Sequence, residues 1–171
     1  GEMAVQLPVL RLKKNEQRRL LAGHLWVYSN EVDVAATPLK AFTPGDQVIV
    51  EDSRGKPLAT AYVNPASLIS ARVFSRRAGE VLHASLIGKR LQQALALRET
   101  MFSDPYYRLV YSESDALPGL IVDRYDNTLV LQINTAGMDC LLDEILTALQ
   151  DLLSPTRILL RSEAHSRTQE G

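Results

Sequence analysis

The spacing of apolar residues changes once along this chain, and that change restricts the possible folds more than any other feature of the sequence. Between residues 9 and 74, apolar and β-branched residues form five short runs separated by turn signals such as Pro44-Gly45-Asp46 and Asn64-Pro65. From residue 84 onwards, apolar residues instead recur every three or four positions. A charged segment, Ser75–Glu80, separates the two patterns. The sequence therefore predicts two small domains, residues 1–76 and residues 77–171.

The first part of the chain contains five runs that are short enough to be single strands. These predicted strands cover Val9–Leu12, Leu25–Tyr28, Gln47–Glu51, Leu58–Val63 and Ser67–Phe74. Between the first two, Asn15 is a candidate cap for a short helix over Glu16–Ala22, and Gly23 is its candidate stop. Five short strands in about 70 residues are typical of a small, closed or half-closed β-barrel.

The second part predicts two helices packed on an antiparallel sheet. Apolar residues cluster on one helical face across residues 84–102, up to and including Met101 and Phe102, and again from Met138 to Leu152. The predicted strands are Tyr107–Tyr111, Leu120–Arg124, Thr128–Asn134 and Arg157–Leu160. The predicted fold class of the whole chain is thus α+β, a small β-barrel followed by an antiparallel α+β domain with two helices.

One charged residue interrupts the apolar face of the first long helix. Arg98 falls in the middle of that face when residues 84–102 are helical. Its long side chain could extend past the core to solvent. It could instead be partly buried and paired with a carboxylate, since an unpaired buried charge is costly. Glu113 and Asp115 are the nearest candidates for that partner along the chain.

The net charge of −1 hides two halves of opposite sign. Residues 1–78 carry 11 Lys and Arg against 7 Asp and Glu, and residues 79–171 carry 8 against 13. The average alone argues against a nucleic-acid partner, whereas the basic first half is compatible with one. No apolar run is long enough to span a membrane, so no membrane partner is expected. A single cysteine excludes an internal disulfide framework and favours a reducing, cytoplasmic setting.

The basic residues of the first half occur beside aromatic residues. They surround the predicted short helix and continue on later strands and turns: Lys13, Lys14, Arg18, Arg19, Arg54, Lys56 and Arg72. His24, Trp26 and Tyr28 alternate directly after the helix. Such a combination on a small β-barrel is a common means of holding RNA backbone and unpaired bases. The alternative is that Trp26 and Tyr28 are core residues and that the charges form a solvated face.

Signatures of catalysis and of metal binding are absent from the sequence. It has no glycine-rich phosphate loop, no His-Glu-x-x-His, no cysteine pair and no nucleophile elbow, and its three histidines lie far apart. Cys140 is predicted to be an exposed, inert thiol, because neighbouring carboxylates make a thiol a poorer nucleophile. Asp115, Asp123 and Asp126 surround a Leu-Pro-Gly loop, where they could bind a cation, act as acid and base, or serve ordinary turn chemistry. We therefore assign no catalytic and no metal-binding residue.

Several of these features occur in an order that resembles a known family. In the first half they are Gly23–Val32, Pro44-Gly45-Asp46-Gln47-Val48, Gly55 and the run from Tyr62 to Arg72. In the second half they are Arg98, Tyr107–Val110, Glu113-x-Asp115-x-Leu117-Pro118-Gly119-Leu120, Asp123-x-Tyr125, Gln132 and the closing Arg161…Arg167-x-x-Glu170-Gly171. Over nearly the whole chain, this pattern is similar to that of bacterial SAM-dependent methyltransferases acting on cytosine C5 of large-subunit (23S) ribosomal RNA.

The resemblance implies a PUA domain over residues 1–76 and the central domain of that family over residues 77–171. It implies that ribosomal RNA is the partner of the first domain. From the basic residues of that domain we predict an RNA footprint of Lys13, Lys14, Arg18, Arg19, His24 and Arg72. We predict structural or interdomain roles for Arg98, Glu113, Asp115 and Asp123.

The resemblance also implies where the chemistry lies. In this family a Rossmann-like catalytic domain follows the Glu-Gly that corresponds to Glu170-Gly171. It carries the loop that binds S-adenosyl-L-methionine and a cysteine whose thiolate adds to C6 of cytosine before methyl transfer to C5. We therefore expect this chain to be an inactive fragment that lacks the C-terminal catalytic domain and holds no cofactor itself. A protein-interaction module with no nucleic-acid role is the alternative.

Overall fold

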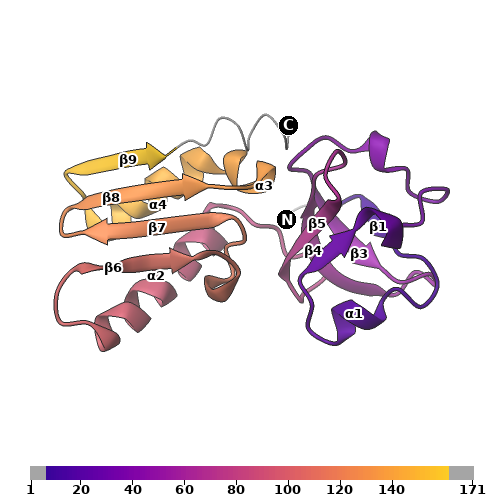
Figure 1. The fold of residues 1–171 in the computed structure, drawn as a ribbon, viewed down its shortest axis with the longest axis horizontal. Coiled ribbons are helices and arrows are strands. Elements are labelled where there is room, and N and C mark those ends of the chain that lie inside the picture. The colour runs from indigo at the N-terminus through magenta and orange to yellow at the C-terminus, as the bar shows by residue number, and fades with distance from the viewer. Residues whose placement is uncertain (1–6, 162–171) are drawn as a thin grey trace, which may run out of the picture. The chain divides into compact units, whose positions relative to one another are not determined.

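The computed structural model describes residues 7–161, which form two compact units divided between Val81 and Leu82. The division lies close to the change of apolar spacing in the sequence. Figure 1 shows strands of the first unit in indigo to magenta and those of the second in red to yellow. Among the described residues, no helix combines the length and the apolar character that a membrane span requires.

The first unit is a curled five-stranded sheet. Its strands are β1 (Val9–Arg11), β2 (Trp26–Tyr28), β3 (Gln47–Glu51), β4 (Pro57–Val63) and β5 (Ile69–Ser75), in the spatial order β1-β3-β4-β5-β2. β1 and β3 are parallel, and the other pairs are antiparallel. An isolated bridge between Leu12 and Val32 links the chain after β1 to the chain after β2. The sheet thus forms the half-closed barrel that the five short runs predicted.

Alternate residues of each strand point into the half-barrel, and in this sequence those residues are apolar. Leu10, Val27, Val50 and Val63 are fully buried in one cluster, and Leu20 of helix α1 (Arg18–Leu21) joins it. Each large aliphatic side chain buried in this way contributes roughly 1.5–3 kcal/mol relative to an exposed one. Burial therefore stabilises a sheet whose strands are individually short.

Helix α1 is shorter than predicted, and the predicted cap is wrong. The residue at the N-cap position is Gln17, without a side-chain capping bond, whereas Asn15 lies in a turn with a φ of 71°. Asn tolerates this left-handed conformation, which ends any helical run. At the other end Gly23 has a φ of 106° and its amide donates to the carbonyl of Leu20, as expected for a helix stop.

The second unit packs helices on one face of a four-stranded sheet (Figure 1). Its strands, in the order β6-β7-β8-β9, are β6 (Tyr106–Tyr111), β7 (Leu120–Tyr125), β8 (Thr128–Ile133) and β9 (Arg157–Arg161). Its helices are α2 (Ala84–Met101), α3 (Ala136–Asp139) and α4 (Leu142–Leu153). The α+β class is therefore confirmed.

Two details of this unit differ from the prediction. β9 is parallel to β8, so the sheet is mixed rather than antiparallel. The reason is that helices occupy the connection between the two strands and return the chain to the end where β8 began. The single helix predicted from Met138 to Leu152 is interrupted at Cys140 and Leu141, where Leu141 leaves the helical backbone with ψ at 13°. A side-chain oxygen of Thr135 accepts from the amide of Met138 and starts α3 separately.

The buried faces of α2 and α4 are those that the apolar spacing indicated, except at one end. Ile87 and Leu91 of α2 and Ile145 of α4 are fully buried. Met101 and Phe102, predicted on the same face, are exposed because the helix ends there. The Phe102 ring stacks on Tyr107, with 5.6 Å between the ring centroids.

We expect Gly119→Ala to destabilise the second unit by about 1–3 kcal/mol, because the φ of Gly119 is 89° and an added Cβ would overlap the side chain of Thr135. Urea denaturation followed by circular dichroism measures this loss. Gly88→Ala is the matched control, since Gly88 lies within α2 with no atom near its Cβ position, and it is expected to gain about 0.5–1 kcal/mol. Equal unfolding midpoints for the two variants would contradict the expectation.

Candidate nucleic-acid interface

The strand directions of the first unit bring its basic segments to one end of the half-barrel. β1 and β3 are parallel and both finish at this end, with Arg11 beside Glu51. β4 starts there and β5 finishes there, because Thr60 pairs with Ser75. β2 also starts there, since it is antiparallel to β5. The turn after β1, helix α1 and the β3–β4 turn therefore share one end, which we call the basic end.

The predicted RNA-binding residues are distributed over these segments. Lys13 and Lys14 are exposed in the turn that follows β1, and Arg18 is exposed at the start of α1. His24 is exposed in the segment that joins α1 to β2. Arg54 and Lys56 are exposed in the β3–β4 turn. The basic end thus presents cations from three separate segments of the sequence.

The β3–β4 turn is organised by one carboxylate. Oδ1 of Asp52 accepts from the backbone amides of Arg54 and Lys56, both at 2.9 Å. These bonds, that of Lys56 foremost, lower the pKa of Asp52 below its ordinary value. The carboxylate therefore holds the turn through backbone contacts, and the two basic side chains of the turn extend to solvent.

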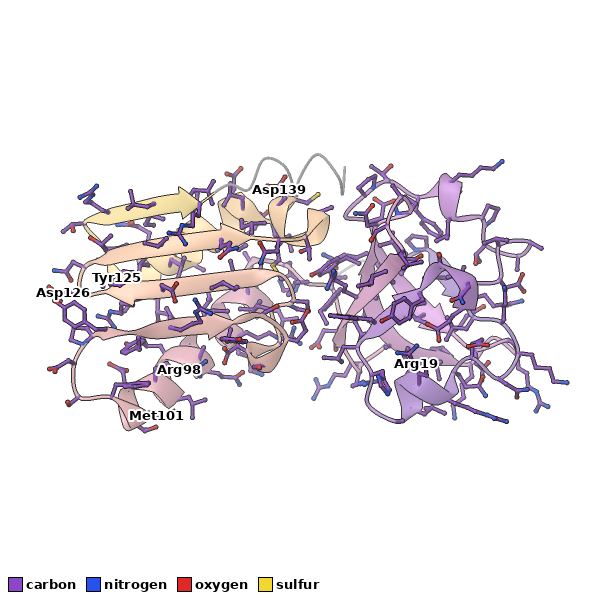
Figure 2. All side chains as sticks on the ribbon, viewed as in Figure 1. Arg19, Arg98, Met101, Tyr125, Asp126 and Asp139 are labelled. Carbon is purple, nitrogen blue, oxygen red and sulfur yellow. The ribbon has the colours of Figure 1, made fainter. Side chains whose placement is uncertain are left out.

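Arg19 is held against the protein. Its guanidinium carbon lies 4.9 Å from the centroid of the Tyr28 ring, and its Nη1 lies 4.0 Å from Oε2 of Glu31. Glu31 is buried, and its Oε1 accepts from the backbone amide of Tyr28 at 2.8 Å. Figure 2 labels Arg19 in this unit. Because its charge is partly neutralised by Glu31, Arg19 is better suited to positioning the Tyr28 ring than to neutralising a phosphate.

Arg72 forms a second pair of a cation and a ring. It is the cross-strand partner of Trp26, and its guanidinium carbon lies 5.2 Å from the centroid of the Trp26 ring. Trp26 retains 37% of its surface, whereas its neighbour Val27 is fully buried. Trp26 is therefore a surface residue rather than a core residue, and a partly exposed indole of this kind is a group on which a base can stack.

Arg76 also belongs to the basic end, although the sequence analysis did not single it out. Its guanidinium donates to the carbonyl of Leu20 at 2.7 Å and to the carbonyl of His24 at 3.2 Å. It therefore ties the end of α1 to the end of β5. The only signal in the sequence was its place in the charged segment after β5, which does not distinguish a tether from a ligand contact.

The predicted residues of the second unit make contacts within that unit. Arg98 and Asp115 form an ion pair, with 2.8 Å between Nη2 and Oδ2 and side chains that are 12% and 6% exposed. The same Oδ2 accepts from the backbone amide of Tyr111, and Nε of Arg98 donates to the carbonyl of Arg108. Figure 2 shows Arg98 on α2, below the sheet. Arg98 is thus partly buried and fastens the loop after β6 to helix α2.

The other two predicted carboxylates have different partners. Oε2 of Glu113 accepts from the hydroxyl of Ser112. Asp123 accepts two bonds from the guanidinium of Arg108, at 2.7 and 3.2 Å, on the exposed face of the sheet. The hydrogen bond to Asp123 raises the pKa of Arg108 above its ordinary value.

Other groups considered in the sequence analysis are separated in the structure. Within residues 7–161, no three His, Cys, Asp or Glu side chains lie close enough together to hold a metal ion. His83 caps α2, with its Nδ1 accepting from the amide of Ser85, and His165 lies outside the described residues. Cys140 is exposed and is not part of a disulfide.

The fold of the first unit places it in a known class. Residues 10–76 match the family of PUA-like domains, so the half-barrel is a PUA-like domain. The fold of the chain resembles that of solved proteins described as methyltransferases. One was crystallised with SAH and has a TM-score of 0.74 at 16% identity. The match covers 91% of this chain and 40% of the solved chain. Another, a SAM-dependent methyltransferase from Streptococcus mutans, has a TM-score of 0.73, also at 16% identity, over 91% of this chain and 41% of its own. At this identity the likeness concerns the fold alone.

The chain is homologous to proteins named ribosomal RNA large subunit methyltransferase I. It is 37% identical over 163 residues to that of Tolumonas auensis, which covers 94% of this chain and 40% of the relative. It is 40% identical over 168 residues to that of Erwinia tasmaniensis, which covers 95% of this chain and 41% of the relative. The chain therefore spans about 40% of the length of these curated relatives.

We expect Asp115→Asn to destabilise the second unit by about 3 kcal/mol, because it leaves the largely buried Arg98 without its counter-charge. Thermal unfolding followed by circular dichroism measures the change. Asp123→Asn removes one charge from the exposed pair with Arg108, and we expect it to cost less than about 1 kcal/mol. An equal loss of stability in both variants would mean that the burial of the Arg98–Asp115 pair does not increase its contribution to stability.

Proposed function

We propose that this chain is the RNA-recognition part of a SAM-dependent ribosomal RNA methyltransferase, acting in the cytoplasm on cytosine C5 of 23S RNA. The PUA-like domain binds structured RNA, and the second unit, residues 82–161, positions it for modification. The observation that carries the proposal is the basic end of the half-barrel, which exposes Lys13, Lys14 and Arg18. The same unit also presents Trp26 on its surface, with the Arg72 guanidinium over the indole ring.

The chemistry of the basic end supports RNA as the ligand. Exposed lysines and arginines neutralise backbone phosphates, and this term dominates the affinity of most protein–nucleic acid complexes. An exposed indole offers a face to an unpaired base. The names of the relatives support the same substrate, since each is called a ribosomal RNA large subunit methyltransferase.

We propose that residues 7–161 of this chain do not bind the methyl donor. The nine glycines of the chain are scattered singly, with no glycine-rich loop of the kind that cradles nucleotide-like cofactors at a helix N-terminus. The residues present therefore do not fit S-adenosyl-L-methionine, and we assign the cofactor no step on this chain. We expect isothermal titration of the 171-residue chain with SAM to show no saturable binding. Methyl transfer to 23S RNA by this chain alone would contradict the proposal.

We expect the double variant Lys13→Glu and Lys14→Glu to bind a 23S RNA fragment more weakly and with a flatter dependence on salt. Each lost phosphate contact should reduce the slope of log K against log salt by about 1. Fluorescence anisotropy at a series of salt concentrations measures both quantities. The matched control is Lys40→Glu with Lys89→Glu, which changes the net charge equally. Lys40 lies in the connection between β2 and β3, and Lys89 lies on α2.

Two outcomes would contradict the RNA footprint. The first is an equal loss of affinity in the control, which would mean that net charge alone governs binding. The second is the absence of binding by the unaltered chain at low salt, which would favour a protein-interaction module instead.

A further inference from the structure

The second unit has one sheet face that no helix covers in the described residues. Helices α2 and α4 pack on the opposite face, onto which Val122, Leu129 and Leu131 project and are buried. The residues between these project to the uncovered side, which we call the open face. Three tyrosines of the open face, Tyr106, Tyr111 and Tyr125, are 60%, 53% and 54% exposed.

A β-bulge is needed to bring all three tyrosines to this face. In β6 the register shifts between Arg108 and Val110, and the two consecutive residues Leu109 and Val110 are both buried. Without the extra residue, Tyr111 would point to the helices instead of lying on the side of Tyr106 and Arg108. The bulge therefore exposes a ring that strict alternation would have buried.

The strand register orders the open face into three rows. The two outer rows run Tyr106, Tyr125, Thr128, Arg157 and Tyr111, Ile121, Gln132, Arg161. The middle row runs Arg108, Asp123, Val130, Leu159. Each outer row thus has tyrosine at the β6 edge and arginine at the β9 edge. Figure 2 shows Tyr125 at the end of β7, by the turn into β8.

The charges of this face match a polyanion. Among the described strand residues of this face, the one carboxylate is Asp123, which accepts from Arg108. The guanidinium carbon of Arg108 also lies 5.2 Å from the centroid of the Tyr111 ring. Arg157 and Arg161 are exposed on the edge strand β9. An interface core with a protein would be depleted of charge. Exposed rings with arginines on a four-stranded sheet are instead the elements with which such sheets stack unpaired bases and hold phosphates.

We propose that the open face of the β6–β9 sheet binds a segment of unpaired RNA, with bases stacked on Tyr106, Tyr125 and Tyr111 and phosphates held by Arg157 and Arg161. This second contact rests on the proposed function, since it assumes that the chain binds RNA, but it uses residues of the second unit, none of which belongs to the basic end. It assigns structured RNA to the half-barrel and single-stranded RNA to the second unit.

The test uses a labelled oligouridylate of about ten nucleotides, within the usual site size of single-strand-binding surfaces. We expect Tyr106→Ala with Tyr125→Ala to weaken its binding by on the order of tenfold for each ring that stacks. The matched variant, Tyr106→Phe with Tyr125→Phe, should retain the affinity, because it keeps the ring faces and removes only the hydroxyls. We expect Arg157→Gln with Arg161→Gln to reduce the salt slope by about 0.7 per lost contact.

The outcomes separate this inference from the proposed function. Lys13→Glu with Lys14→Glu should weaken binding of the structured 23S fragment and leave oligouridylate binding nearly unchanged, and the tyrosine variants should do the reverse. Unchanged oligouridylate affinity in the alanine variant, or an equal loss in the phenylalanine variant, would overturn the open-face assignment while leaving the half-barrel's role intact. Sedimentation measures whether the chain associates with itself as its concentration rises. Self-association that the alanine variant abolishes would assign the open face to a second copy of the chain, and it would also overturn the RNA assignment.

Discussion

Both units depend on one constraint, the alternation of side chains across a β-strand. A strand that buries every second residue in a core must present the residues between them to the other side. In β2 the buried Val27 places Trp26 and Tyr28 outside the half-barrel, where arginines stack on them. In β7 the buried Val122 places Tyr125 on the open face. Trp26 and Tyr125, two of the rings proposed to meet RNA, thus face outwards because of how the cores are filled.

The net charge of the chain does not distinguish charged side chains that are bound within the protein from those that are exposed to solvent. Some arginines are structural, such as Arg98 on Asp115 and Arg76 on the carbonyls at the end of α1. Others, such as Lys13 and Lys14, are exposed and available to a ligand. Sequence composition counts both groups alike, although only the second can release counterions when RNA binds. The acidic balance of the second half therefore does not exclude a basic face within it.

Much of the fold could be predicted from local patterns. The bounds of β3 agree with the predicted run, and the buried positions of α2 follow from the apolar spacing. The predictions that were wrong concern features that depend on contacts between residues far apart in the sequence. Asparagine is common both as a helix N-cap and in left-handed turns, and the immediate neighbours of Asn15 do not distinguish the two possibilities. The direction of β9 depends on where the connecting helices return the chain, and the exposure of Tyr111 depends on a bulge that no residue type announces.

The sequence by itself determined the α+β class, the change from short strands to amphipathic helices, the two candidate partners of Arg98 and the basic residues of the first half. These follow from periodicity and residue chemistry, which are local. Only the tertiary structure decided that Asp115 rather than Glu113 pairs with Arg98, that Trp26 is a surface residue, and that tyrosines of β6 and β7 share a face with the arginines of β9. Each of these depends on strand order and register, which bring together residues far apart in the chain through the packing of the whole unit.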